Sequence, residues 1–373
     1  MIPRAIETRI KDRLFQGKAI IVYGARQVGK TTLIEKIVAE TGVSALWLNG
    51  DEADVREIFV DATSVGLKAY FGNHKIVVID EAQRILNIGL TIKLITDQIK
   101  NIQVIATGSS AFELADSIKE PLTGRKYEFN LYPLSFGEMT KETGLLHEKR
   151  LLEHRLIFGY YPEIVTKSGN ETELLKLLAG SYLYKDLLML EGIKKPVLLE
   201  KILKALALQV GSEVSYHEIG NLVNASNETV EKYISLLEQT YIIFQLNAFS
   251  RNVRNEIRKG KKIYFYDNGI RNAIIGNLNP LHTRVDKGAL WENFIISERF
   301  KFLQYNQESF SPYFWRTTQQ QEVDYIEERA GKLRAFEIKW KSSKGRLPVT
   351  FDKAYPDTEF KLVNKDNYFE FIL

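Results

Sequence analysis

The sequence predicts an α/β protein built around a parallel sheet, with a second α/β part near its C-terminus. Through residues 1–145, short β-like apolar runs alternate with helical patterns, which is typical of a parallel sheet whose strands are joined by helices. From about residue 285 a helical pattern is again followed by strand-like runs. At 373 residues, the chain is also too long for one typical core, and we expect several domains.

The elements follow in order. Residues 1–145 form the predicted parallel core, with strands at 19–23, 45–48, 76–80, 103–107 and 127–131. Residues 146–208 carry leucines at helical spacing and predict a helical lid or linker. Residues 209–284 contain a helix–turn–helix pattern at 214–240 and then strands at 241–249 and 262–267. Residues 285–373 begin with a helix and predict strands near 313–316, 322–327, 333–340 and 360–363.

Composition excludes several classes of protein. The chain is 45% hydrophobic and 26% charged, as in ordinary globular proteins, and its apolar runs are too short to cross a bilayer. Charges interrupt every apolar stretch near the N-terminus, so we expect no signal peptide and a cytoplasmic protein. The absence of cysteine excludes disulfides, thiolate metal sites and cysteine nucleophiles.

A glycine-rich loop follows the first predicted strand. Residues 18–32 read KAIIVYGARQVGKTT and match the pattern G-x-x-x-x-G-K-[ST], between an apolar strand and an amphipathic helix. In such a loop successive backbone N–H groups face a β-phosphate, a lysine reaches the β- and γ-phosphates, and a hydroxyl holds Mg²⁺. A flexible turn is the alternative, and the strand and helix on either side argue against it. The predicted ATP-binding residues are Gly24, Ala25, Arg26, Gln27, Val28, Gly29, Lys30, Thr31 and Thr32.

Two acids end the third predicted strand. Residues 76–81 read IVVIDE, a buried-strand run that ends in Asp80 and Glu81. We expect Asp80 to hold Mg²⁺ together with Thr31, and Glu81 to polarise the attacking water. A core strand that happens to end in a turn acid is the alternative, which the phosphate loop upstream disfavours. ATP and Mg²⁺ are therefore the predicted ligands.

Two further features belong to this site by position. The strand VIATGSS ends in hydroxyls, and either Thr107 or Ser109 is a candidate sensor of the γ-phosphate, with strand-end capping as the alternative. Arg125 is expected at an exposed turn, where it serves either as a finger to its own or a neighbour's ATP or as an ordinary surface arginine.

The helix–turn–helix pattern and the strands after it predict a winged helix. Ser215 and Glu218 form a capping box, and residues 251–262 (RNVRNEIRKGKK) are strongly basic. A solvated loop is the ordinary interpretation of such a run, and contact with a DNA backbone is the functional one. The candidate contacts are Arg251, Arg254, Arg258, Lys259, Lys261 and Lys262. The polar face of the second helix is instead acidic, with Glu228, Glu231 and Glu238 against Lys232, so we expect no sequence-specific reading.

The C-terminal strands carry a set of carboxylates. Period-two alternation places Glu337 and Lys339 on one face of a predicted hairpin, with Asp324 on the neighbouring strand and Glu292 on the preceding helix. Acids on adjacent strands beside a lysine can hold Mg²⁺ for phosphodiester attack. A hairpin with a solvated charged face is the bland alternative.

Together these segments resemble the prokaryotic AAA-type ATPases, related to the STAND branch, that join an ATPase core to a winged helix and a C-terminal restriction-endonuclease-like domain. The resemblance covers essentially the full length and rests on GARQVGKTTL, VVIDEAQRI, ATGSS, LTGRKYEFNLYPLSFGEM, GYYPEIV, GALWENF and EVDYI…FEIKW. It implies that Lys30, Thr31, Asp80 and Glu81 carry out the ATP chemistry, with Arg125 as a finger-like candidate. It also maps Asp324, Glu337 and Lys339 onto the PD-(D/E)xK signature, with Glu292 as the helical acid and Val323 in place of the proline. The C-terminal domain of that family has no settled role.

These features predict an ATP-hydrolysing switch whose nucleotide state positions a winged helix and a nuclease-like domain on DNA, through backbone contacts without sequence specificity. The alternative is a signalling or scaffold ATPase whose C-terminal domain binds a protein partner and cleaves nothing. A phosphate-loop kinase is disfavoured, because the acid pair and the sensor strand suit water activation. Whether the chain forms a homo-oligomer stays open.

Overall fold

The structure is a computed structural model that describes residues 1–108, 122–182, 195–250, 260–341 and 344–373. Its described residues form two compact units. The first contains residues 1–133 and 239–241, and the second contains most of the remainder. The four-part division expected from the sequence stays a prediction, and the two units are described separately below.

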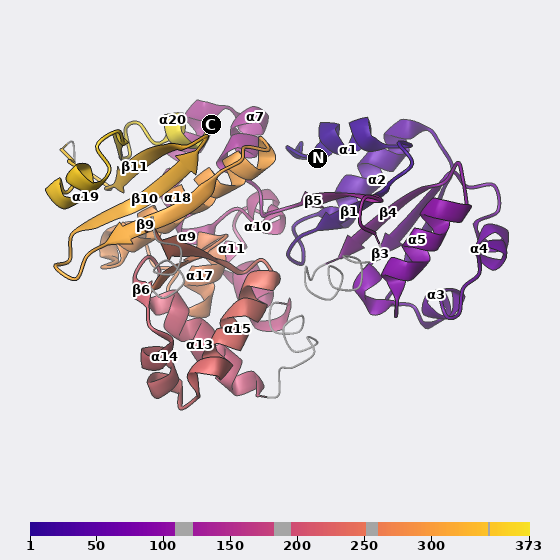
Figure 1. The fold of residues 1–373 in the computed structure, drawn as a ribbon, viewed down its shortest axis with the longest axis horizontal. Coiled ribbons are helices and arrows are strands. Elements are labelled where there is room, and N and C mark those ends of the chain that lie inside the picture. The colour runs from indigo at the N-terminus through magenta and orange to yellow at the C-terminus, as the bar shows by residue number, and fades with distance from the viewer. Residues whose placement is uncertain (109–121, 183–194, 251–259, 342–343) are drawn as a thin grey trace. The chain divides into compact units, whose positions relative to one another are not determined.

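A five-stranded parallel sheet forms the first unit, in the order β2-β3-β4-β1-β5 (Figure 1). Helices α1 (Glu7–Arg13), α2 (Lys30–Thr41), α3 (Ala53–Ile58), α4 (Ser64–Phe71) and α5 (Ile88–Gln98) accompany it. The strands are β1 (Ala19–Tyr23), β2 (Ala45–Asn49), β3 (Ile76–Asp80), β4 (Gln103–Gly108) and β5 (Lys126–Asn130). Each agrees with its predicted strand to within one residue, which confirms the predicted parallel α/β core.

The pattern of burial explains why these strands are the easiest elements to predict. Every residue of β1 is buried, and so are the first four residues of β3 and all of β4. Central strands of a parallel sheet are covered on both faces, and they therefore read as continuous runs of valine, isoleucine and alanine. The carboxyl ends of β1, β3 and β4 lie side by side, so the segments that follow them meet at one edge of the sheet.

The second unit begins with helices. They are α7 (Phe136–Thr143), α8 (Leu145–Arg150), α9 (Leu152–Phe158), α10 (Pro162–Thr166), α11 (Glu171–Leu177) and α13 (Pro196–Leu208), with a π-helical turn at Leu178–Tyr182. The described part of the predicted helical region 146–208 is therefore mostly helical, with non-helical connections at 159–161 and 167–170. Ser135 starts α7 with a complete capping box in which Glu138 takes part.

Helix, turn, helix and two antiparallel strands follow, in the order expected for a winged helix. These are α14 (Tyr216–Val223), α15 (Asn227–Gln239), β7 (Ile243–Ala248) and β8 (Lys261–Phe265). The Ser215 side chain caps α14 by accepting a hydrogen bond from the Glu218 N–H, and Asn224 makes the turn in a left-handed conformation. A two-residue strand, β6 (Glu213–Val214), pairs with β8.

The C-terminal part continues with α17 (Asn268–Ile274), α18 (Lys287–Tyr305), β9 (Ser311–Arg316), β10 (Glu322–Arg329), β11 (Lys332–Ile338), α19 (Val349–Ala354), β12 (Glu359–Val363) and α20 (Phe369–Ile372). Strands β9, β10 and β11 are antiparallel neighbours, and β12 pairs in parallel with β11. The expected strand 333–340 ends earlier than predicted, at Ile338.

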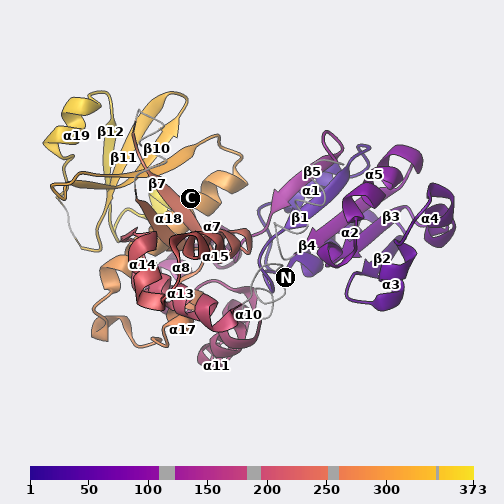
Figure 2. The same cartoon turned by 60° about the horizontal axis from the view of Figure 1, so that its bottom comes forward.

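One seven-stranded sheet crosses the boundary expected at residue 284. Its order is β12-β11-β10-β9-β7-β8-β6, and β7 joins β9 in parallel through Asn247–Tyr313 and Ala248–Phe314. Figure 2 labels β7, β10, β11 and β12 of this sheet. A hydrophobic core lies over this junction, made of Phe249, Trp315, Val323, Ile326, Ala335 and Phe351. The strands after the helix–turn–helix and the C-terminal strands thus share one sheet and one core.

Among the residues that the structure describes, no helix combines the length and the apolar character needed to cross a membrane.

Candidate functional site

The phosphate loop lies between β1 and α2, as predicted. Gly24 is packed so closely that a Cβ atom on it would lie 2.1 Å from the Leu131 carbonyl oxygen, which no side chain could avoid. Gly29 has a φ of 92° and caps the start of α2, a conformation that favours glycine. The two positions therefore require glycine for different reasons. Gly24 approaches another part of the backbone closely, and Gly29 has a left-handed conformation.

The motif lysine lies against the loop. Lys30 is buried, and its ammonium donates hydrogen bonds of 2.9 Å to the carbonyl oxygens of Gly24 and Ala25. A positive charge is thus held at the first turn of α2, where the helix dipole also favours anions. The remaining predicted residues of the loop, Arg26, Gln27 and Val28, connect these two ends, and Thr32 continues the first turn of α2.

Three elements meet at Asp80, the last residue of β3. The Thr31 hydroxyl donates a hydrogen bond of 2.8 Å to Asp80 Oδ2. On Oδ1, Asp80 accepts a hydrogen bond from the Thr107 hydroxyl of β4 and one of 3.1 Å from the Glu81 N–H. The hydroxyl and carboxylate that we expect to hold Mg²⁺ are therefore adjacent, and both are oxygen ligands of the kind that Mg²⁺ prefers.

Glu81 follows directly and adopts a left-handed backbone conformation, with a φ of 49°. Such a conformation is uncommon for a residue with a side chain and is often found at functional sites. The Gln83 amide donates a hydrogen bond of 2.5 Å to Glu81 Oε2. A carboxylate held in this way beside Asp80 is suited to orient a water molecule.

The three sensor and finger candidates lie in different places. Thr107 is fully buried and joins the site through Asp80, whereas Ser109 lies outside the described residues. Arg125 precedes β5, where its carbonyl accepts a hydrogen bond from the Ala19 N–H, and its side chain pairs with Asp97 at 2.7 Å. Ala19 begins β1 and the loop follows the other end of that strand, about 13 Å away at about 3.3 Å per residue. The backbone of Arg125 therefore lies beside the end of β1 that is farther from the phosphate loop, and its role as a finger, to its own or a neighbour's ATP, stays a prediction.

Sequence reasoning missed Arg4. Its guanidinium is buried and donates hydrogen bonds of 2.6 Å to the carbonyl oxygens of Val28, in the phosphate loop, and Tyr132, just after β5. Arg4 thus ties the loop to the segment that follows β5 in the same unit. No local pattern marks this residue, because its partners lie 24 and 128 positions along the chain.

The predicted C-terminal site residues come together in the second unit. Asp324 accepts a hydrogen bond of 2.7 Å from the Ile338 N–H, and the Lys339 ammonium lies 3.9 Å from Asp324 and 3.6 Å from Glu337. Glu292 lies on α18, and Glu292 Oε1 is 3.2 Å from the ammonium of Lys262. Asp324 acts electrostatically on both Glu292 and Lys262.

Lys262 is the main correction to the predicted DNA contacts. It is 2% exposed and pairs with Glu292 and Glu322, so it is not available at a surface. Lys261 is half-buried over the ring of Tyr216. Arg251, Arg254, Arg258 and Lys259 lie outside the described residues. Of the six predicted contacts, only Lys261 lies in the described part with its side chain partly exposed.

Charge and burial oppose each other in this cluster. Burial raises the pKa of Glu292, against the effect of Lys262. Burial alone would lower the pKa of Lys262, but Glu292 and Glu322 outweigh it and raise that pKa. Burial, and then the charge of Glu292, raises the pKa of Tyr264, whose hydroxyl donates a hydrogen bond of 2.7 Å to Glu292. The cluster is thus built to keep a lysine charged.

A divalent metal does not fit this cluster as the structure has it. The ammonium of Lys262 already lies between two of the acids, where a metal ion would have to approach them. In the described ranges, no group of three or more histidine or acidic side chains is arranged to hold a metal ion. The Mg²⁺ that the nuclease-like resemblance implies is therefore not supported at Glu292, Asp324 and Glu337.

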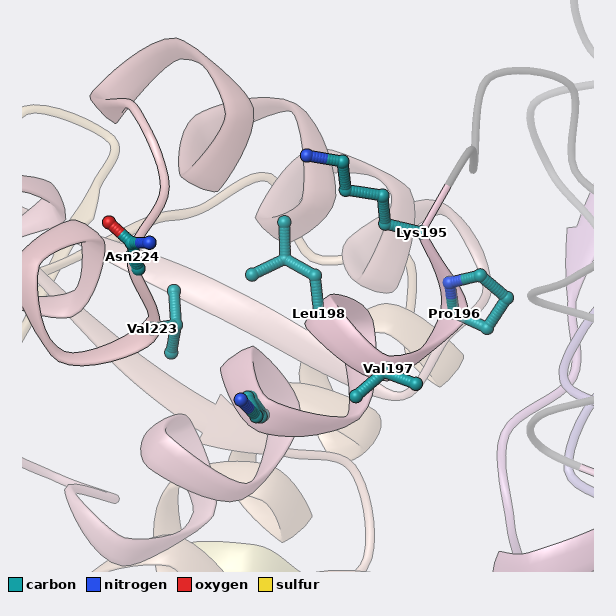
Figure 3. A pocket seen from close by; sticks show the side chains of 7 residues that line it. Lys195, Pro196, Val197, Leu198, Val223 and Asn224 are labelled. Carbon is teal, nitrogen blue, oxygen red and sulfur yellow. The ribbon is translucent and has the colours of Figure 1, made fainter.

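A separate hollow of about 440 Å³ lies between the start of α13 and the end of α14. Figure 3 shows Val223 and Asn224 on one side and the residues from Pro196 to Leu198 on the other. Lys195 and Lys201 also line it. Basic side chains therefore border the turn of the helix–turn–helix, although none of them belongs to the predicted cluster 251–262.

Comparison with known protein families gives one match in the first unit and two in the rest of the chain. Residues 16–140 match a family described as an AAA domain, residues 149–281 match a domain of unknown function (DUF8612), and residues 287–370 match another (DUF4143). The first of these matches supports a P-loop ATPase of the AAA type. The winged-helix and nuclease-like parts of the expected resemblance stay predictions.

Relatives span most of the chain. An uncharacterized protein of Mycobacterium tuberculosis is 27% identical over 343 residues, which cover 90% of this chain and 73% of that protein. An uncharacterized protein of Haemophilus influenzae is 25% identical, with 85% and 82% covered. The solved RuvB Holliday junction branch migration motor of Thermotoga maritima is 14% identical, covers 69% of this chain and 95% of its own, and has a TM-score of only 0.34.

Proposed function

We propose that this protein is an ATP-hydrolysing switch. The observation that carries the proposal is the convergence on Asp80, whose carboxylate accepts hydrogen bonds from Thr31 at the start of α2 and Thr107 at the end of β4. The buried ammonium of Lys30 lies at the same helix start. An anion-binding helix start and an oriented carboxylate are the parts that phosphoryl transfer from ATP requires.

Each residue then has a role. Backbone N–H groups of residues 24–29 bind the phosphates of ATP, and Lys30 neutralises their charge. Mg²⁺, when bound, supplies further charge neutralisation, and Thr31 and Asp80 are the residues that would hold it. Glu81 orients the water that attacks the γ-phosphate, and Thr107 keeps the Asp80 carboxylate in place. Ser109 and Arg125 stay candidates, as a sensor and as a finger to the chain's own or a neighbour's ATP.

The test is ATP binding and ATP turnover measured on the same variants. We expect Lys30→Ala to abolish both, and Glu81→Gln to retain ATP binding while hydrolysis stops. Glu35→Gln, an exposed glutamate on α2, is the matched control and should behave as the wild type. If Glu81→Gln hydrolyses ATP at the normal rate, the role given to Glu81 is wrong.

We further propose that the nucleotide state repositions the second unit on a DNA backbone. The support is the basic segment 251–262, in which Lys261 is the described basic residue with a partly exposed side chain, and the two lysines beside the helix–turn–helix turn. Phosphate contacts release counterions, so the logarithm of the binding constant should fall by about 0.9 per contact for each unit of log salt. A salt titration with plain duplex DNA, with and without ATP, measures this slope. A DNA-binding constant that does not change with salt concentration would exclude contacts with the DNA phosphate backbone.

A scaffold or signalling ATPase is the second candidate, and one observation favours it. Glu228 and Glu231 are exposed on α15, while Glu238 is held by hydrogen bonds from Gln245 to both of its oxygens. An acidic helix face repels phosphate and suits a basic protein surface. Replacing Glu228 and Glu231 with glutamine should strengthen DNA binding if DNA approaches this helix, and should leave it unchanged if the helix docks a protein.

A further inference from the structure

A buried lysine contacts Glu292, the helical acid of the predicted C-terminal site, and Glu322 beside it. Lys262 extends from β8, and its ammonium lies 3.2 Å from Glu292 Oε1 on α18 and in closer contact with Glu322 Oε1 on β10. The Lys262 side chain is 2% exposed, whereas the side chains of Glu292 and Glu322 are 17% and 27% exposed. The lysine is therefore the most enclosed member of the cluster, with the acids arranged around it.

The remaining acids have their own partners. Asp324 accepts the Ile338 N–H at 2.7 Å, and Lys339 lies within 4 Å of both Asp324 and Glu337. Arg316 is a further 3.9 Å neighbour of Glu322. Lys339 is 47% exposed and can move, but Lys262 is enclosed. The two lysines thus differ in kind, because only one of them is fixed in place by burial.

We infer that Lys262 is the built-in cation of Glu292 and Glu322, and that the C-terminal part therefore neither binds a divalent metal ion through Glu292 nor uses one to cleave nucleic acid. A buried ammonium requires compensating negative charge, and Glu292 and Glu322 supply it to Lys262. Mg²⁺ demands oxygen ligands at about 2.0–2.1 Å in octahedral geometry. A dication brought to the same carboxylates would face the ammonium at close range in a medium that screens charge poorly.

The lysine also has a structural consequence. Lys262 belongs to the strand after the helix–turn–helix, whereas Glu292 and Glu322 belong to the C-terminal helix and strands. Its ion pairs therefore lie across the same junction as the pairing of β7 with β9. A residue expected to hold DNA instead joins two parts of the second unit.

The first experiment measures metal binding directly, on the full-length protein without nucleotide. The Asp80→Asn variant removes the carboxylate proposed to hold metal at the phosphate loop, so that any remaining site is elsewhere. Mn²⁺ is titrated and free Mn²⁺ is followed by electron paramagnetic resonance. We expect no stoichiometric site below about 1 mM, a weak-site limit for divalent ions. One bound Mn²⁺ that is lost when Glu292→Gln is added would overturn the inference.

The second experiment asks whether Lys262 and Glu292 stabilise each other. Lys262→Met leaves the acids uncompensated, and we expect the Tm of the second unit to fall by about 10 °C. Adding Glu292→Gln removes one uncompensated charge and should recover part of that loss, which gives a non-additive double-mutant cycle. Lys261→Met, at the neighbouring position of β8, is the control and should change Tm little. If Lys262→Met is as stable as the wild type, or if the two changes are simply additive, the inference is wrong.

Neither result depends on the proposed ATPase, because ATP turnover by the first unit uses other residues. A failed metal or stability test would leave the ATPase proposal intact, and loss of the ATPase proposal would leave this one intact.

Discussion

The hydroxyl of Thr107 donates a hydrogen bond to the carboxylate of Asp80, from one strand of the first sheet to its neighbour. Thr107 is fully buried, so this contact is not exchanged with bulk water. With Thr31 and the Glu81 N–H on the same carboxylate, three donors hold Asp80 in one orientation. The orientation of Asp80 is therefore built into the sheet before any ligand binds.

Removing the Thr107 hydroxyl tests this orientation. In Thr107→Val the side chain keeps its shape but the donor is lost, and a hydrogen bond to a charged group is worth about 1.5–3 kcal/mol. We expect ATP hydrolysis to fall about tenfold to a hundredfold while ATP affinity changes little. Thr96→Val, which removes a hydroxyl bonded to the Ile92 carbonyl on α5, is the control. An unchanged turnover number for Thr107→Val would show that Asp80 needs no such support.

Arg4 should matter for ATP affinity. Arg4→Ala leaves the Val28 and Tyr132 carbonyl oxygens without this donor, so the phosphate loop is less well fixed before ATP binds. We expect the Kd for a fluorescent ATP analogue to rise about tenfold, which corresponds to about 1.4 kcal/mol. Arg13→Ala, an exposed arginine at the end of α1, should leave the Kd unchanged. Equal affinities of wild type and Arg4→Ala would contradict the role given to this residue.

The close approach at Gly24 gives a prediction with an internal control. In Gly24→Ala the new methyl group would lie 2.1 Å from a backbone oxygen, so the loop must move, and we expect ATP binding to be lost. Gly42 also has a left-handed φ, of 65°, but no atom lies within 4 Å of the position of its Cβ. Gly42→Ala should cost only the conformational penalty of about 1–2 kcal/mol and retain ATP binding. Calorimetric titration with ATP distinguishes the two variants.

Acid stability of the second unit should depend on Asp286. Burial opposes ionisation of this carboxyl, but hydrogen bonds and ion pairs with Arg284 and Arg271 lower its pKa to about 2. A lowered pKa stabilises the fold fully above the unfolded value of about 3.9, and this stabilisation is lost as the pH falls towards 2. Allowing for solvent screening, we expect Asp286→Asn to reduce the free energy of unfolding by about 1–2 kcal/mol at pH 7.

The same variant should lose less stability than the wild type between about pH 4 and pH 2, because it lacks the group that titrates there. Urea unfolding at several pH values measures both effects. The exposed Asp352→Asn is the control. Parallel stability curves for wild type and Asp286→Asn across this window would show that the ion pair with the two arginines does not stabilise the fold.

The first unit was largely predictable from the sequence, for a physical reason. Its central strands are buried on both faces, so their amino-acid pattern is local and strong. The sequence signal of the phosphate loop is equally local, because its glycines, Lys30 and Thr31 lie within eight consecutive residues. Asp80 and Glu81 were recognisable because a buried strand ends there, and parallel strands bring their carboxyl ends together.

The features that the sequence did not reveal at the two sites depend on contacts between residues far apart in the chain. Lys262 stands in a basic run and looks exposed, but its burial depends on α18 and β10, which are encoded later in the chain. Arg125 looks like a free turn residue until the register of β5 against β1 places it at the far end of the sheet. A run of charged residues shows only the local composition. Whether each charged side chain is exposed depends on the elements that pack against it, which lie elsewhere in the chain.

The parallel pairing of β7 with β9 has a consequence for synthesis on the ribosome. All strands of the first sheet have been made once residue 130 is reached, so that sheet can form early. Strand β7, in contrast, ends at Ala248, and one of its edges stays unpaired until β9 (Ser311–Arg316) has been synthesised. During that interval the nascent chain presents an unpaired strand edge, which is a template for association with other chains. During synthesis, the second unit is therefore more open to association with other chains than the first sheet is.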